Sequence, residues 1–125
     1  MSGKRYSPLH IWVRFLPGNE ALLGVTHALV RMQKKPVCVN LCDPGDTLRR
    51  GDWMGDIEFF KGVFDLRCPV DGVVSDVNAR VILQPQSLQT DPEQWLVRLQ
   101  NVVSTHALLD TAAYLRFLRE ERKET

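Results

Sequence analysis

This chain of 125 residues lacks the marks of several protein classes. Its three cysteines are an odd number and form no Cys-x-x-Cys pair, which argues against a disulfide framework and a zinc site. No apolar run approaches the roughly 20 residues that span a bilayer, and no apolar segment follows the N-terminus as in a secretory signal. A net charge of +1 gives no field that selects nucleic acid. We expect a cytoplasmic protein that binds neither nucleic acid nor membrane.

Motifs of catalysis are missing as well. The chain has no Gly-x-Ser-x-Gly elbow and neither of the glycine-rich patterns that cradle phosphates. Its histidines are far apart in the sequence: His10, His27 and His106. The cysteines fit small packing positions better than ligand positions: Cys38, Cys42 and Cys68. We therefore expect no catalytic site and no metal site.

Short β-prone segments separated by turn residues make up most of the chain. The predicted strands are His10 to Phe15, Ala21 to Val25, Val37 to Leu41, a hairpin around residue 60, a strand after Pro69, and Trp95 to Leu99. Turn clusters such as Asp43-Pro44-Gly45-Asp46 separate them. Because strands and helices do not alternate, a doubly wound sheet is disfavoured and a β-sandwich or flattened barrel with helical additions is favoured.

Two segments have helical spacing. One short helix is predicted from His27 to Lys35, with Thr26 as its N-cap and Pro36 ending it. A second helix lies near the C-terminus, with Asp110 as its cap. Its predicted apolar stripe is Thr111, Ala112, Tyr114, Leu115 and Leu118.

The stretch Gly55 to Val63 predicts two strands joined by a tight turn, with Lys61 at the tip. A solvated surface lysine is one interpretation, since lysines are rarely buried. The other is a site of covalent modification. A small β domain without an active site, but with a protruding lysine on a rigid hairpin, suits a carrier better than an enzyme. Gly62 relaxes the geometry of the turn.

Motifs along most of the chain resemble those of the glycine cleavage system H protein, a lipoyl carrier. Gly55-x-x-Glu58-x-x-Lys61 resembles the family's G-x-x-E-S-V-K, whose lysine takes the lipoyl group. Further matches, in order, are His10-Ile11-Trp12-Val13 with H-E-W-V, Gly24-Val25-Thr26 with G-I-T, Asp65-Leu66-x-x-Pro69-Val70-x-Gly72 with D-L-x-x-P-V-x-G, and the last helix. Each motif alone is weak, but the ordered set is specific.

The resemblance implies a mainly β, lipoyl-type barrel-sandwich hybrid with a short internal helix and a C-terminal helix. It implies one domain over residues 1–125, with an ordered core of about 6–121. Lipoate would be the cofactor, on Lys61. The implied partners are a lipoate ligase or lipoyl transferase, a dihydrolipoamide dehydrogenase-type enzyme, glycine decarboxylase and aminomethyltransferase. The surface for modification and docking is expected to comprise Gly55, Glu58, Phe59, Phe60, Gly62, Phe64 and Asp65.

Residues near the lysine depart from the family pattern. They are Ile11, Phe59, Phe60, Gly62, Phe64 and Arg67, where the family has mostly polar or small residues. In the H protein, polar residues there line a cleft for the loaded arm. We therefore expect a divergent role, such as that of a lipoate-binding protein in sulfur oxidation with a heterodisulfide-reductase-like complex. Carrying an aminomethyl group in ordinary glycine cleavage is the alternative.

Three other hypotheses remain open. The chain could be an unmodified scaffold or regulator of the same fold. It could be a biotinyl domain, although such domains usually have methionines beside the lysine rather than Phe60 and Gly62. It could be an enzyme, for which no set of residues is found. We also expect at least one of the three hairpin phenylalanines to be exposed, since a tight turn cannot bury all of them.

Overall fold

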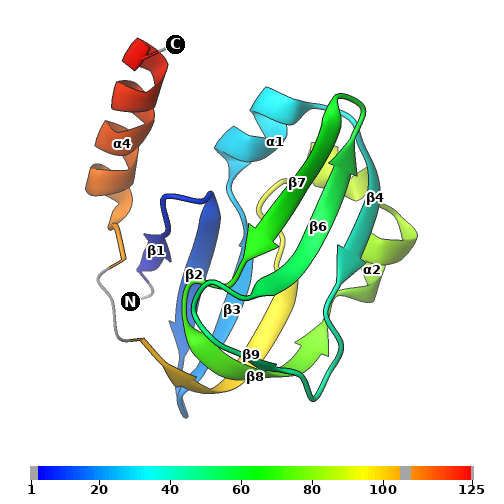
Figure 1. Cartoon of the computed structure of the whole chain (residues 1–125), viewed down its shortest axis with the longest axis vertical. Helices are drawn as coiled ribbons and strands as arrows, with labels where there is room; N and C mark the ends of the chain where they lie inside the picture. The colour runs from blue at the N-terminus through cyan, green and yellow to red at the C-terminus, as the bar shows by residue number, and fades with distance from the viewer. Residues whose placement is uncertain (1–2, 105–107, 125) are drawn as a thin grey trace.

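Two β-sheets pack against each other in this computed structural model, which describes residues 3–104 and 108–124 (Figure 1). Within these residues the larger sheet has the strand order β1-β2-β3-β9-β8-β5 and the smaller has β4-β6-β7. The bounds are β1 Lys4–Tyr6, β2 Ile11–Leu16, β3 Glu20–Val25, β4 Pro36–Leu41, β5 Thr47–Leu48, β6 Trp53–Phe59, β7 Gly62–Arg67, β8 Asp71–Val77 and β9 Val97–Val103. The expected mainly β architecture is confirmed.

One hydrophobic core fills the space between the sheets. Alternate residues of the strands point into it, because side chains along a strand face opposite sides. Ile11 and Val13 of β2 and Leu23 of β3 come from the larger sheet, and Ile57 of β6 and Leu66 of β7 come from the smaller one; all are fully buried. Each such side chain stabilises the fold by about 1.5–3 kcal/mol.

Helix α1, His27–Gln33, begins where the sequence predicts. The Thr26 hydroxyl accepts a hydrogen bond from the Leu29 amide at 3.3 Å, which is the expected N-cap. The helix ends two residues before the predicted end. Lys34 and Lys35 both have positive φ, 55° and 36°, so the chain leaves the helix before it reaches Pro36.

Two further short helices were not predicted. They are α2, Ala79–Leu83, and α3, Ser87–Thr90. Asn78 begins α2 by accepting a hydrogen bond from the Arg80 amide at 3.1 Å, and its side-chain amide donates to the Trp95 carbonyl at 2.6 Å. The expectation of one internal helix is therefore wrong. Helices this short depend on caps and tertiary contacts rather than on periodicity.

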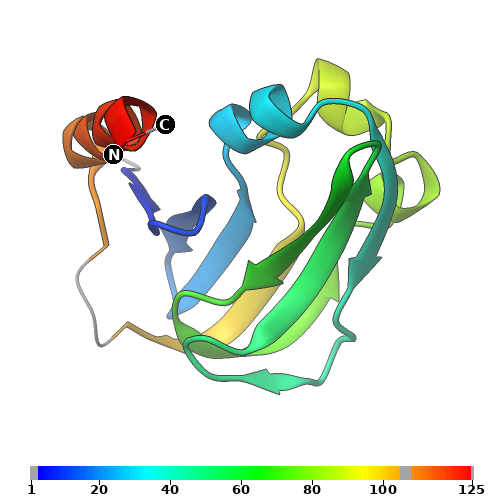
Figure 2. The same cartoon turned by 45° about the horizontal axis from the view of Figure 1, so that its top comes forward.

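Helix α4, Thr111–Glu124, is capped by the Asp110 carboxylate, which accepts from the Ala113 amide at 2.8 Å. Its inward side carries Tyr114, which stacks on Tyr6 with ring centroids 4.4 Å apart. The predicted apolar stripe is only partly right, because Leu115 is 53% exposed. Both views show α1 lying between α4 and the β6–β7 hairpin (Figures 1 and 2). No helix in the described part of the chain is long and apolar enough to cross a membrane.

Candidate functional site

The β6–β7 hairpin presents Lys61 at its tip, as the sequence predicts. Phe59 pairs with Gly62, so Phe60 and Lys61 alone form the connection. Lys61 is exposed and makes no ion pair with any residue that the structure describes. Gly62 has φ of +152°, a conformation that favours glycine, and a Cβ there would meet nothing within 4 Å. The amine is therefore free to be reached and acylated.

Contacts from the segment that follows α1 support the tip. The Phe60 amide donates to the Lys35 carbonyl at 3.1 Å, and the Lys35 ammonium lies 5.8 Å from the centre of the Phe60 ring. Sequence analysis did not single out Lys35. It lies 25 positions before Phe60 in the sequence, and no local pattern indicates that the two residues are neighbours in space. The contact holds the turn against the body of the protein.

Acidic side chains line the outer face of the hairpin below the lysine. Glu58 is exposed, and Asp56 lies directly across from Asp65 in the strand register. Asn40 of β4 donates to Asp56 at 2.8 Å, and Arg67 lies 3.4 Å from Asp65. These contacts offset the repulsion between two facing carboxylates. The result is a carboxylate-rich strip that leads to an exposed amine.

The three phenylalanines divide as expected for a tight turn. Phe60 is 78% exposed, which confirms the expectation that at least one would be on the surface. Phe64 is half-buried, with its ring 6.1 Å from that of His10 in an edge arrangement. Phe59 is 4% exposed and belongs to the core, so it is not part of the docking surface.

Gly55 is also not part of that surface. It is buried where β4 and β6 approach closely, and a Cβ on it would overlap the Asn40 carbonyl oxygen. Packing between two strands thus accounts for this glycine. Of the residues expected to form the docking surface, the hairpin does present Glu58, Phe60, Gly62, Asp65 and, in part, Phe64.

A polar cluster around the buried His10 joins α4 to the chain beside the hairpin. His10 Nδ1 lies 3.2 Å from the Tyr114 hydroxyl, and His10 Nε2 lies 3.8 Å from Glu121. Burial lowers the pKa of His10, against an opposing effect of the Glu121 carboxylate. The backbone of His10 has φ of 66°. Tyr114 and Glu121 could not be assigned to His10 from sequence, since about a hundred residues separate them.

Two of the three cysteines, Cys42 and Cys68, are buried thiols. Burial raises the pKa of both Cys42 and Cys68 to about 11, and the Cys68 thiol donates to the Val70 carbonyl at 3.1 Å. All three cysteines are free. Among the residues that the structure describes, no three His, Cys, Asp or Glu side chains come together as metal ligands. His106 lies outside the described residues.

Comparison with known proteins gives the family. The family model described as "Glycine cleavage H-protein" matches residues 4–121. The chain is 32% identical to the glycine cleavage system H protein of Lachnoclostridium phytofermentans over 117 residues, covering 93% of this chain and 92% of the relative. It is 34% identical to that of Symbiobacterium thermophilum over 120 residues, covering 93% of each.

A solved structure agrees with these sequence matches. The crystal structure of a glycine cleavage system H protein from Mycobacterium marinum has a TM-score of 0.84 and 25% identity, covering 95% of this chain and 96% of that one. The expected fold and the expected resemblance are both confirmed. With a matching fold, an exposed lysine on the hairpin and matches over nearly its whole length, the chain belongs to the glycine cleavage H-protein family.

Proposed function

We propose that this chain is the lipoyl carrier of a glycine cleavage system, with lipoate in amide linkage to Lys61. The observation that carries the proposal is the position of Lys61, exposed on a two-residue turn and without an ion pair to any described residue, in a chain that matches the family over residues 4–121. The chain itself is a carrier and not an enzyme. Its partners are a lipoate ligase or transferase, glycine decarboxylase, aminomethyltransferase and a dihydrolipoamide dehydrogenase.

The residues present fit such a group. Acylation turns the Lys61 ammonium into a neutral amide, and no residue described near it depends on its charge for an ion pair. When bound, lipoate supplies a cyclic disulfide for holding the carried fragment and for thiol–disulfide exchange with a partner. Lys61 acts as the tether, and a tether raises the local concentration of its end at each partner's active site.

The surface around the tip suits recognition by several partners. Phe60 and Val63 are exposed apolar side chains, 78% and 63%, beside the exposed carboxylates of Glu58 and Asp65. Exposed apolar side chains with a polar border are typical of interaction surfaces. We propose that the modifying enzyme and the partners recognise this mixed patch, which consists of Glu58, Phe60, Gly62, Val63, Phe64 and Asp65.

Lipoylation is tested by intact-mass measurement. The chain is incubated with a lipoate ligase, ATP and lipoate, and we expect a gain of one lipoyl group. Lys61→Arg should gain none, whereas Lys34→Arg, a substitution at another exposed lysine near the hairpin, should be loaded like the wild type. If the wild type stays unmodified while a known carrier is loaded in the same tube, the chain is an unmodified scaffold of this fold.

The aminomethyl cargo needs a separate experiment. The lipoylated chain is supplied to glycine decarboxylase, and exchange of glycine carboxyl carbon with labelled bicarbonate is followed. We expect exchange that rises with carrier concentration and is absent for Lys61→Arg. A fully lipoylated chain that gives no exchange would contradict ordinary glycine cleavage.

One set of observations favours a second candidate, a carrier for another cargo such as a sulfur species passed to a heterodisulfide-reductase-like complex. Phe64 turns an aromatic edge toward His10, Ile11 is fully buried, and Arg67 lies beside Asp65. Two positions at which this chain departs from the family thus hold an apolar ring, Phe64, and a guanidinium that pairs with Asp65, Arg67. A lipoylated chain that fails in glycine exchange but accepts sulfur from a persulfide donor onto the arm would support this candidate.

A further inference from the structure

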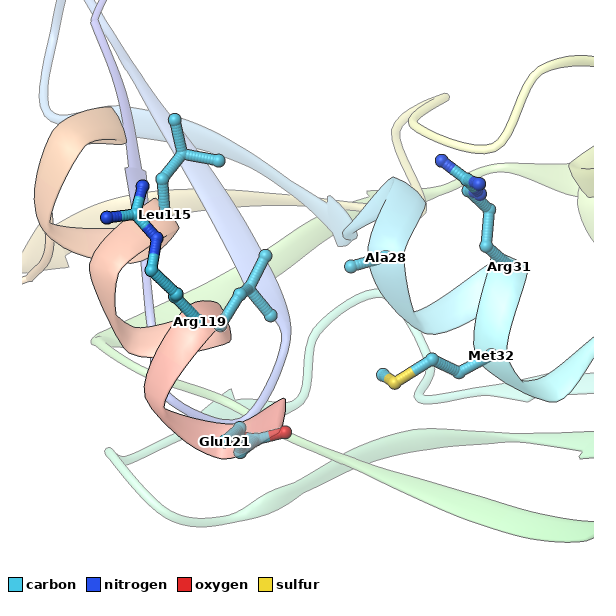
Figure 3. A pocket seen from close by; sticks show the side chains of 7 residues that line it. Ala28, Arg31, Met32, Leu115, Arg119 and Glu121 are labelled. Carbon is cyan, nitrogen blue, oxygen red and sulfur yellow. The ribbon is translucent and has the colours of Figure 1, made fainter. Parts of the chain in front are cut away.

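A groove of about 550 Å³ separates α1 from α4. Figure 3 shows Ala28 and Met32 pointing from α1 across the groove toward α4. Leu115 and Leu118 line the opposite wall. The proposed function uses neither helix surface, so the groove has no role assigned so far.

The apolar side chains that line the groove recur at the spacing of a helix face that packs against a core. α1 buries Leu29 and Val30 against the sheets but leaves Met32 48% exposed, and α4 leaves Leu115 53% exposed. Each helix therefore has an apolar side chain that no other residue in the described part of the chain fully covers. Exposed apolar side chains gathered in one concave place indicate a binding surface.

The charges beside the groove are mainly positive. Arg31 stands on the α1 side and Arg119 on the α4 side (Figure 3). Neither makes an ion pair within the described residues. Glu121 is the acidic residue that lines the groove, and its carboxylate lies near His10. Two guanidinium groups against one carboxylate leave a net positive charge, which favours an occupant with negative charge.

Helix α1 connects the groove to the hairpin. Met32 is three residues before Lys35, and the Lys35 carbonyl accepts the hydrogen bond from Phe60 at the hairpin turn. A molecule that fills the groove therefore contacts the same helix whose C-terminal connection supports the turn that carries Lys61. It lies on the side of α1 that faces α4, so it leaves the hairpin surface open (Figures 1 and 2).

We propose that the α1–α4 groove docks an acidic amphipathic helix of a partner protein. A groove between two helices accepts a third whose apolar residues recur every third or fourth position, as in other helix-in-groove complexes. Acidic residues flanking that apolar stripe would meet Arg31 and Arg119. This docking is additional to the proposed function, and its test requires no lipoylation.

The first experiment uses the full-length chain labelled with ¹⁵N and a synthetic peptide of about 16 residues, roughly four helical turns. The peptide has leucines at helical spacing and glutamates on both flanks. A matched peptide has lysine in place of each glutamate. We expect the acidic peptide to shift the amide signals of α1 and α4, and the lysine peptide to bind at least about tenfold more weakly.

Charge-reversal variants locate the site. Arg31→Glu with Arg119→Glu should weaken binding of the acidic peptide by at least about tenfold. Arg49→Glu with Arg80→Glu changes the net charge equally, away from the groove, and should leave the dissociation constant within about twofold. Spectra of each variant without peptide establish that it is folded.

Four results would overturn the proposal. They are no shift on α1 and α4 with the acidic peptide, equal binding of the two peptides, equal weakening by the two double variants, or a dimer in sedimentation that Arg31→Glu with Arg119→Glu dissociates. The last result would assign the groove to a second copy of the chain.

Discussion

Replacing Gly55 by alanine tests whether this glycine serves packing or recognition. A Cβ at this position would overlap the Asn40 carbonyl oxygen. The obstacle is backbone, held by the β4–β6 pairing in which Leu41 lies opposite Gly55, so it cannot rotate away as a side chain can. The two strands must separate locally, which weakens their hydrogen bonds.

Two other buried glycines give a comparison for the stability that Gly55→Ala would lose. A Cβ at Gly24 would come 2.6 Å from the ring of Trp12, and one at Gly72 would come 3.2 Å from the Gln100 carbonyl, a distance that a small shift can relieve. Overpacking costs about 1–3 kcal/mol and more where the obstacle cannot move. We expect Gly55→Ala to lose about 2–4 kcal/mol, and Gly72→Ala to lose less than about 1 kcal/mol.

Thermal unfolding followed by circular dichroism measures the difference. For a chain of this size, about 3 kcal/mol lowers the Tm by on the order of 10 °C. Well below its Tm, Gly55→Ala should be lipoylated at nearly the wild-type rate, because the substituted atom is buried and the surface of the hairpin is unchanged. A wild-type Tm for Gly55→Ala, or a larger loss for Gly72→Ala, would refute the packing argument.

The burial of His10, Cys42 and Cys68 and the exposure of Phe60 lead to three further predictions. Burial lowers the pKa of His10, so the unfolded chain binds a proton there more readily than the folded chain. The free energy of unfolding should therefore fall as the pH drops below about 6.5. Denaturant titrations at several pH values measure this dependence, and His10→Gln should flatten it. Because burial raises the pKa of Cys42 and Cys68 to about 11, a thiol reagent at pH 8 should label them only after denaturant is added; rapid labelling of either in the native chain would contradict this. Phe60→Ser should change stability by less than about 0.5 kcal/mol yet raise the carrier concentration needed for half-maximal partner activity; a large Tm loss would show that the ring is structural.

Sequence reasoning predicted the elements with strong local signals. The strands β2 and β3, the turn at Lys61, and the caps Thr26 and Asp110 are all present in the structure. Each depends on neighbouring residues, through side-chain alternation or a hydrogen bond to an amide two or three positions on. The α2 helix was missed because its cap, Asn78, is fixed by a contact with Trp95 that lies across the fold.

The sequence by itself therefore determined the mainly β class, the hairpin and the lysine at its tip. Tertiary structure alone decided which hairpin residues face outward, since Gly55 and Phe59 are buried by β4 and the core, whereas Phe60 is exposed. It alone joined His10 to α4, and placed α1 and α4 on either side of a groove. Local propensity acts between neighbours in the chain, but burial and strand approach depend on residues that meet only when the whole chain has folded.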